Sequence, residues 1–328
     1  MRCLISQNHN PWFNLATEEY FLKNSNEEIF LLYINEPCIV VGKHQNLYSE
    51  INFKYSKINN IKLARRISGG GTVYQDFNNL NFSFIHNFKN LEKINYSKFT
   101  LPILESLIHM GIDVKLSDRN DLIINSMKVS GNAMHIYKTR VLSHGTLLFN
   151  SNLEHLSESL RNNSTNYFDR SIKSVKSKVA NISNYWDSSK TIDKFTTEIF
   201  THVINTSKHS ETILIPTTQS EEIAICQLSK NKFESWEWIY GYSPKYIFKN
   251  NIHLTESSIP FELVVEHGII TNTQLYASES KYSIYHYAMN IIINAKHDFE
   301  IIFQLLNSDY KIKSIQKFDI YEFCYQLF

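Results

Sequence analysis

The sequence predicts an α+β fold in which most strands pair in antiparallel fashion. Short apolar runs of strand length follow one another along the first half of the chain. Turn-forming residues join most of these runs, whereas a parallel sheet requires long crossover connections that are usually helical. After Pro244 the character of the sequence changes, which predicts a second and smaller domain.

The first helix and the first strands are expected near the N-terminus. Asn14 is placed to cap a helix over residues 15–22, and Glu18 and Glu19 then fall in its first turns, where the helix dipole favours acids. Apolar runs predict strands at 29–34, 38–41, 72–74, 81–85, 121–125 and 145–149. Residues 35–37 form the expected turn between the first two strands, and residues 76–79 are turn-like and can close a hairpin.

Helical spacing appears after residue 100. Apolar side chains recur at helical intervals between Leu101 and Ile108, and Gly111 is expected to end this helix. The polar residues 150–163 and parts of residues 191–241 are also predicted to be helical. These helices separate groups of strands instead of following each strand.

The boundary between the two expected domains is placed after Lys249. Residues 1–249 then form the larger domain, and residues 250–328 form a small α+β domain. The expected elements of the small domain are a hairpin with strands at 261–265 and 269–275 and a helix over residues 298–306.

Composition and charge exclude several classes of protein. The chain has 328 residues and a net charge of +1, so nothing requires a nucleic-acid or membrane partner. No apolar run is long enough for a transmembrane helix, and the N-terminus is too polar for a signal peptide. The cysteines are scattered and form no metal-binding pattern, which is typical of a cytoplasmic protein with free thiols. They are Cys3, Cys38, Cys226 and Cys324.

Three consecutive glycines, Gly69 to Gly71, stand out in a chain that has nine. Glycine permits positive φ angles and lets backbone N–H groups approach a ligand closely. Arg65 and Arg66 precede this glycine loop, and a glycine nest beside fixed cations can hold a phosphate or a carboxylate. The loop has neither the Walker A nor the GxGxxG pattern. The alternative is a tight turn between strands with exposed arginines.

A second group of polar residues follows the glycine loop. Asp121, at the start of a strand, can hold a divalent cation with Asn120 as a neutral oxygen partner. Lys128 precedes Ser130 and Gly131, and its charge can stabilise the oxygens of an acyl-phosphate anhydride. The alternative for this group is a hairpin that carries a surface lysine.

His144 and the basic residues 173–179 are further candidates. A single histidine before a strand usually has a structural role, so His144 is a candidate site residue only in combination with the other residues. The basic stretch is either a solvated face or a loop that covers a charged ligand.

Together these segments resemble those of the lipoate–protein ligase A family. The matching segments, in the family's order, are GKHQN at 42–46, RRISGGGTVY at 65–74, RNDLII at 119–124, KVSGNA at 128–133, SHGTLLFN at 143–150, IKSVKSKVAN at 172–181 and WEWIYGYSPKY at 236–246. Many motifs in the same order make chance resemblance a poor explanation. The residues after Lys249 fit the family's small C-terminal domain by position and length.

The resemblance implies a fold shared with biotin ligases and class II aminoacyl-tRNA synthetases. It also implies that ATP and Mg²⁺ convert lipoate to lipoyl-adenylate and pyrophosphate. The lipoyl group is then expected to pass to a lysine of a lipoyl carrier domain, in a 2-oxoacid dehydrogenase or in the glycine-cleavage carrier protein. A monomer is the expected state.

The resemblance also assigns roles to single residues. Lys128 is expected to be catalytic, bridging lipoyl carbonyl and phosphate oxygens, while Asn120 and Asp121 lie near the phosphates and Asp121 holds Mg²⁺. The other residues expected to line the ligand site are Arg66, Ser68, Gly70, Gly71, Thr72, Val73, Tyr74, Ser130, Ala133 and His144.

The chain departs from the family pattern at three positions. Tyr33 stands where a tryptophan is common at the far end of the lipoyl tunnel, which leaves the preferred acyl length open. Ile67 replaces a common third arginine. Gln75 replaces a frequent histidine, which predicts a weaker polar contact to the ligand.

Two alternatives to a ligase remain open. The first is a lipoyl or octanoyl transferase that uses a preformed acyl donor without ATP. Octanoyltransferases of this superfamily use a cysteine nucleophile, but Cys38 lies in an apolar run, and the glycine, Lys128 and His144 segments contain no cysteine. The second is a non-catalytic lipoate- or carrier-binding protein, which the presence of Arg66, Asp121 and Lys128 disfavours.

Overall fold

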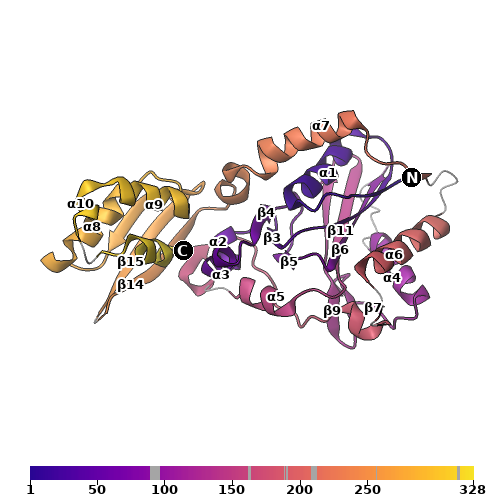
Figure 1. The fold of residues 1–328 in the computed structure, drawn as a ribbon, viewed down its shortest axis with the longest axis horizontal. Helices are drawn as coiled ribbons and strands as arrows, with labels where there is room; N and C mark the ends of the chain where they lie inside the picture. The colour runs from indigo at the N-terminus through magenta and orange to yellow at the C-terminus, as the bar shows by residue number, and fades with distance from the viewer. Residues whose placement is uncertain are drawn as a thin grey trace. The chain divides into compact units, whose positions relative to one another are not determined.

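A computed structural model of the chain describes residues 1–88, 97–161, 164–187, 189, 191–207, 213–255, 257–315 and 318–328. Within it, the chain forms two compact units (Figure 1). The first unit comprises residues 1–43, 61–157 and 174–235, and the second comprises residues 44–60, 158–173 and 236–328. The expected boundary after Lys249 falls inside a strand of the second unit, and the two-domain assignment stays a prediction.

A six-stranded sheet forms the centre of the first unit. Its strands, in spatial order, are β10 (Asn132–Tyr137), β11 (Arg140–Leu148), β6 (Asn79–Asn87), β2 (Ile29–Ile34), β1 (Arg2–Ile5) and β13 (Ile213–Leu214). Two three-stranded sheets accompany it, with the orders β4 (Lys62–Arg65), β3 (Cys38–Val41), β5 (Val73–Gln75) and β7 (Lys115–Leu116), β8 (Leu122–Ile124), β9 (Met127–Ser130). Most of the described pairings are antiparallel, as predicted; β1 is parallel to β2 and β13, and β3 to β4.

Helices cover both faces of the six-stranded sheet. Figure 1 shows α1 (Pro11–Asn24) and α7 (Gln219–Leu228) on one side, and α4 (Ser97–His109) and α6 (Ile192–Thr206) on the other. Alternate side chains of β6, such as Phe82 and Phe84, pack with α4 and α6 in the main core. Three shorter helical elements complete the unit: α5 (Leu153–Ser159), which continues into the second unit, η3 (Ile182–Tyr185) and the π-helical turn η4 (Ser229–Phe233).

The second unit is built on a four-stranded antiparallel sheet. Its strand order is β12 (Tyr167–Asp169), β14 (Tyr246–His253), β15 (Ser258–Glu266) and β16 (Ile269–Leu275). Its helical elements are α2 (Leu47–Glu50), α3 (Phe53–Ile58), η2 (Ser164–Asn166), η5 (Glu237–Gly241), η6 (Ser280–Tyr282), α8 (Ser283–Ile291), α9 (Phe299–Ser308), α10 (Tyr310–Lys313) and α11 (Ile320–Gln326). The predicted hairpin β15–β16 and the predicted helix α9 are both confirmed.

The first helix begins earlier than predicted. Asn10, not Asn14, caps α1 and accepts hydrogen bonds from the backbone of Trp12 and Phe13, because Pro11 suits the first helical position. Asn14 is buried inside the helix and donates to Asn35. The acids expected in the first turn therefore lie deeper in the helix, and the dipole argument for them was wrong.

Both predicted turns exist, but the turn at residues 76–79 does not form the hairpin that it was predicted to close. Residues 35–37 connect β2 to β3, and residues 76–79 connect β5 to β6, but in each case the two strands belong to different sheets. Asp76 shapes the second turn by accepting the backbone N–H of Asn78. The helix that ends before Gly111 is confirmed as α4, whereas the helical predictions for 150–163 and 191–241 fall partly on residues outside the described part of the chain.

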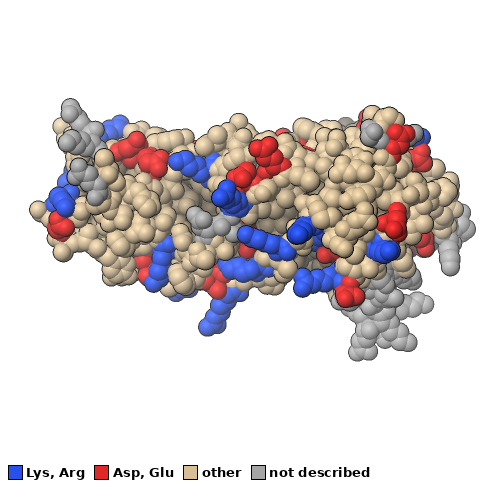
Figure 2. Space-filling model, turned by 90° about the horizontal axis from the view of Figure 1, so that it is seen from below, with Lys and Arg blue, Asp and Glu red and all other residues tan. Residues whose placement is uncertain are grey.

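The surface and the helices agree with the composition. The net charge of +1 reflects 33 basic and 32 acidic residues, and Figure 2 shows both kinds on the face in view. Among the described residues, no helix combines the length and apolarity needed to cross a membrane.

Candidate active site

The glycine loop connects β4 to β5 and is shaped from inside by Arg66. The buried guanidinium of Arg66 donates to the carbonyls of Val40, Gly69 and Gly71 at 3.1, 2.6 and 2.7 Å. Gly70 has φ +87°, and a Cβ there would lie 3.0 Å from Nη2 of Arg66, so both conformation and space require glycine. Burial lowers the pKa of Arg66 to about 10, which leaves it cationic at neutral pH.

Ser68, His144 and Glu18 form a buried hydrogen-bonded series beside this loop. Ser68 Oγ lies 2.6 Å from Nε2 of His144, and Nδ1 of His144 lies 2.8 Å from Oε2 of Glu18. Arg66 Nε donates to Ser68 Oγ at 3.1 Å. Because an ionised carboxylate only accepts, a neutral His144 carries its proton on Nδ1 and accepts at Nε2 from Ser68. The series therefore fixes the direction of the Ser68 hydroxyl.

Glu18 is a site residue that the sequence reasoning missed. Its carboxylate is 1% exposed and also accepts from the hydroxyls of Tyr33, at 2.9 Å, and Ser83. One sequence signal could have found it. Glu18 is three residues after Leu15 and four before Leu22, so it lies on the apolar face of the helix, where an acid is expected to be buried. Serine, histidine and an acid also form nucleophilic triads, but Ser68 is fully buried and held by Arg66, which suits positioning.

Lys128 and Asp121 form an ion pair at the start of the β8–β9 hairpin. Lys128 Nζ lies 3.1 Å from Oδ1 of Asp121, and both side chains are partly exposed. The Lys128 side chain lies over Gly131: a Cβ at residue 131 would be 3.2 Å from Nζ. Asn125 and Ser126 both have positive φ and form the tight turn that brings β9 back beside β8. The hairpin thus presents a cation and a carboxylate side by side.

A cavity of about 300 Å³ opens next to this ion pair. Its lining is rich in charge and hydroxyl groups and consists of Ser117, Asp118, Arg119, Asp121, Ile123, Ser126, Lys128, Ser177 and Lys178. Among the described residues, the buried Ser130 hydroxyl has no hydrogen-bond partner, as expected of a group that meets a ligand. The three cations of the lining suit a polyanion such as a nucleotide phosphate.

The basic stretch after β12 links the glycine loop to this cavity. Ser174 Oγ accepts the backbone N–H of Thr72 at 2.9 Å. Further on, the Lys128 N–H donates to the carbonyl of Lys178 at 2.8 Å, and Ala180 returns a bond to Lys128. Of the two interpretations of residues 173–179, the structure thus favours a loop beside the candidate ligand site over a purely solvated face.

The remaining predicted site residues belong to the same unit. Ala133 faces the glycine loop, since a Cβ at Gly70 would lie 3.8 Å from that of Ala133. The Asn120 carbonyl accepts from Asn132, with Asn120 at φ +59°. Tyr74 is buried and stacks on His155, and Val73 precedes it in β5. The first unit therefore forms one cluster at the glycine loop and one at Lys128, whereas Val73 and Tyr74 lie in β5 and the Tyr74 ring contacts His155.

Comparisons with known proteins agree with this geometry. Residues 10–204 match the family model described as the lipoyl protein ligase A/B catalytic domain. The chain is also 35% identical to the lipoate–protein ligase LplJ of Bacillus subtilis, over 99% of this chain and all of that protein. The chain belongs to the lipoate–protein ligase family. It is therefore an enzyme of the ligase class, and the family resemblance read from its motifs is confirmed.

Solved structures share the fold of this ligase. The structure of P. falciparum LipL1 in complex with lipoate is 25% identical, with a TM-score of 0.63 over 96% of this chain and 98% of that one. A lipoate–protein ligase A bound with ATP is 24% identical, with a TM-score of 0.63 over 74% of this chain and 98% of that one. The predicted biotin/lipoate ligase fold is thereby confirmed.

The positions at which this ligase departs from the family pattern are buried. The Gln75 side chain accepts from Asn35 at 2.7 Å. The Tyr33 hydroxyl donates to Glu18. Burial raises the pKa of Tyr33 well above the ordinary value, and the Glu18 carboxylate raises it further. Ile67 is 4% exposed and Cys38 is fully buried, with the pKa of the Cys38 thiol raised by burial. Gln75 and Tyr33 thus both bond to other side chains of the protein.

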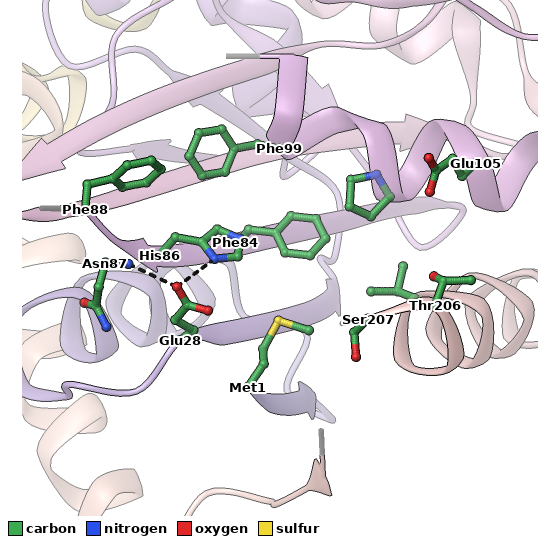
Figure 3. A pocket seen from close by; sticks show the side chains of 12 residues that line it. Met1, Glu28, Phe84, His86, Asn87, Phe88, Phe99, Glu105, Thr206 and Ser207 are labelled. Carbon is green, nitrogen blue, oxygen red and sulfur yellow. Dashed lines mark hydrogen bonds and ion pairs between the residues drawn. The ribbon is translucent and has the colours of Figure 1, made fainter. Parts of the chain in front are cut away.

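A second cavity of the ligase lies on the face of the six-stranded sheet that α4 and α6 cover (Figure 3). Aromatic side chains from β6 and α4 form much of its wall, including Phe84 and Phe99, and Glu28 bridges His86 and the backbone of Asn87. It holds about 370 Å³. Because Phe84 and Ser83 point to opposite faces of β6, this cavity is separated from Glu18 and His144 by the sheet.

Proposed function

We propose that this enzyme activates lipoate with ATP to lipoyl-adenylate and then transfers the lipoyl group to a lysine of a lipoyl carrier domain. The observation that carries the proposal is the pairing of Lys128 with Asp121 at a cation-lined cavity joined to the glycine loop. A carboxylate becomes a good electrophile only after adenylation, which requires charge neutralisation at the α-phosphate.

The residues of the two clusters divide this work. Lys128 places its charge at the phosphate and carbonyl oxygens of the anhydride, while Arg119 and Lys178 supply further charge in the same cavity. Ser68, held in one orientation by Arg66 and His144, offers a fixed polar contact for the carboxyl end of lipoate. The glycines of the loop leave backbone N–H groups accessible to the bound anion.

Asp121 is the residue that would hold Mg²⁺. Mg²⁺ usually takes one or two carboxylates together with substrate phosphates, and Asp121 already faces a cation on the cavity wall. Among the described residues, no three His, Cys, Asp or Glu side chains are grouped so that they could hold a metal ion. This fits an ion that ATP also binds better than an ion held by the protein alone. When bound, the ion would neutralise charge on the phosphate oxygens.

The acceptors we propose are the carrier domains of 2-oxoacid dehydrogenases and of the glycine-cleavage system, in a reducing cytoplasm. All four cysteines are free, which agrees with such a compartment. Cys38 is fully buried with a raised pKa, so a thioester mechanism of the transferase type lacks a reactive thiol there.

ATP–pyrophosphate exchange with and without lipoate tests the proposal. Exchange that depends on lipoate is the expected result. Absence of exchange, combined with normal acyl transfer from synthetic lipoyl-adenylate, would contradict ATP activation and favour the transferase alternative.

A further inference from the structure

The edge of the six-stranded sheet in the first unit carries an exposed basic surface. β10 is the last strand of the sheet and is paired on one side with β11. Its residues are mostly half-exposed, and Ile136 is 43% exposed. Strand edges of this kind are accessible to another protein unless they are covered.

Lysines from four separate segments of the first unit gather beside this strand; they are Lys23, Lys43, Lys138 and Lys232, and we call them the lysine face. Lys23 of α1 and Lys232 of η4 both bond to the buried carboxylate of Glu19, at 2.5 and 2.6 Å. One carboxylate therefore offsets two lysines. The two bonds hold the ammonium groups in fixed positions. Burial raises the pKa of Glu19, but the two lysines outweigh this effect and the pKa is lowered.

His135 and Tyr137 of β10 show that the lysine face lies against the strand. Tyr137 has the ammonium of Lys23 at 5.4 Å and that of Lys138 at 5.3 Å from its ring centre. Burial lowers the pKa of His135, and the charges of Lys43, Lys23 and Lys232 lower it further against Glu19. The position of the lysine face beside β10 rests on the contacts of Lys23 and Lys138 with the Tyr137 ring, and Glu19 joins Lys232 to Lys23.

The lysine face is continuous with the glycine loop. Ala133, His135 and Tyr137 alternate along one side of β10, and Ala133 faces Gly70. Four residues of strand span about 13 Å, so the row leads from the loop outward over that distance. The backbone N–H of Lys43 also donates to the carbonyl of Ser68 at 2.8 Å.

We propose that the lysine face docks an acidic surface of the protein that accepts the lipoyl group, and so guides the acceptor lysine to the glycine loop. This proposal rests on the proposed function. The concentration of lysines contrasts with a net charge of +1 for the chain, and charge complementarity raises the rate of encounter with an acidic partner. The alternative is that lysines merely protect an exposed strand edge from aggregation.

The test compares two double variants of the full-length enzyme with equal loss of charge. Lys23→Gln/Lys138→Gln removes two charges from the lysine face and leaves Lys232 paired with Glu19. Lys115→Gln/Lys194→Gln is the matched control, with one change on β7 and one on α6, away from β10. The acceptor probe is an isolated apo lipoyl domain from a dehydrogenase E2 subunit, and hydroxylamine serves as a small acceptor without a surface.

We expect the first variant to raise the KM for the lipoyl domain about tenfold at low salt, because charges at an interface act mainly on encounter. Its lipoate-dependent pyrophosphate exchange and its transfer to hydroxylamine stay at the wild-type level, and the control variant behaves as wild type throughout. The KM of the wild type rises with salt, and that of the first variant rises less.

An unchanged KM in Lys23→Gln/Lys138→Gln, with normal exchange, overturns the docking proposal. Loss of exchange in the wild type overturns the proposed function instead, so the two failures are distinguishable. If the double variant does not fold, the salt dependence of the wild type decides, because a KM that is insensitive to salt contradicts electrostatic docking.

Discussion

Nδ1 of His144 lies 2.8 Å from Oε2 of Glu18 in the interior of the first unit. This contact joins β11 to α1 and sets which nitrogen of His144 faces Ser68. The same carboxylate anchors Tyr33 and Ser83, so one acid positions three polar side chains next to the glycine loop.

The first prediction concerns Glu18→Gln. The amide replaces one accepting oxygen by a donor, so at least one of three buried donors loses its partner. We expect a loss of about 1–3 kcal/mol in the free energy of unfolding and a raised KM for lipoate, because Ser68 is no longer oriented. Urea unfolding and steady-state kinetics measure the two effects. The exposed change Glu154→Gln serves as the control and should stay within about 0.5 kcal/mol of wild type.

The second prediction concerns Lys128→Ala. Loss of one charged group that stabilises developing charge typically costs about 10²–10³-fold in rate, so lipoate-dependent exchange should fall by that factor. Stability should change by less than about 1 kcal/mol, because Lys128 and Asp121 are partly exposed. Lys115→Ala on β7 should retain full exchange. Full exchange in Lys128→Ala would remove the catalytic role from this residue.

The third prediction concerns the thiols. Cys226 is exposed, whereas Cys3, Cys38 and Cys324 are buried, and burial raises the pKa of Cys3 to about 11 and of Cys324 to about 12. Iodoacetamide should therefore modify the native protein once, at Cys226, and leave the overall lipoylation rate intact. Peptide mass spectrometry locates the adduct. Inactivation that follows modification of Cys38 would point to a cysteine-dependent transferase.

The sequence predicted most elements of the fold but not how they assemble. The strands at 38–41 and 72–74 and the helix before Gly111 were visible because their apolar patterns are local. Sheet membership was not visible, since a turn such as 76–79 looks the same whether it joins paired strands or strands of different sheets. The cap of α1 was misplaced because both Asn10 and Asn14 suit a helix start, and Pro11 decides between them.

The site was predictable to the extent that its residues lie in short motifs. The glycine loop, Asp121 and Lys128 each combine residue types whose chemistry is evident along the chain. Glu18 was not, because its function depends on contacts with Ser83 and His144, which are distant in sequence. Similarly, the inward direction of Arg66 depends on carbonyls of β3 and of the folded loop.

The fourth prediction contrasts two glycines. A Cβ at Gly145 would overlap Oδ1 of Asn132 and lie 2.5 Å from a ring atom of Phe82, inside the packed sheet. Gly145→Ala should therefore cost about 1–3 kcal/mol of unfolding free energy, or more if the strands cannot shift. At Gly69 no atom lies within 4 Å of the Cβ position, so Gly69→Ala should leave stability within about 0.5 kcal/mol of wild type. Equal thermal shifts for the two variants would contradict this packing.

The second unit contains a buried histidine that no proposed step of the reaction uses. His297 accepts from the Tyr246 hydroxyl at Nδ1, at 2.5 Å, and donates from Nε2 to the carbonyl of Leu327, at 2.7 Å. Its ring also stacks on Phe328. Burial lowers the pKa of His297 to about 4, so the folded protein holds this ring neutral.

The fifth prediction follows from this pKa. In the unfolded chain His297 takes up a proton near pH 6.5, whereas in the native state it does so near pH 4, so the unfolded state binds more protons between these values. The stabilisation is fully present above pH 6.5 and is lost as the pH falls, by about 2–3 kcal/mol at pH 4.5. His297→Gln should be less stable at pH 7 but should lose less on acidification, whereas the exposed His253→Gln should follow wild type. Hydrogen exchange of β14 amides between pH 7 and 4.5 measures the second unit directly, and parallel pH profiles for wild type and His297→Gln would show that His297 is not the group responsible.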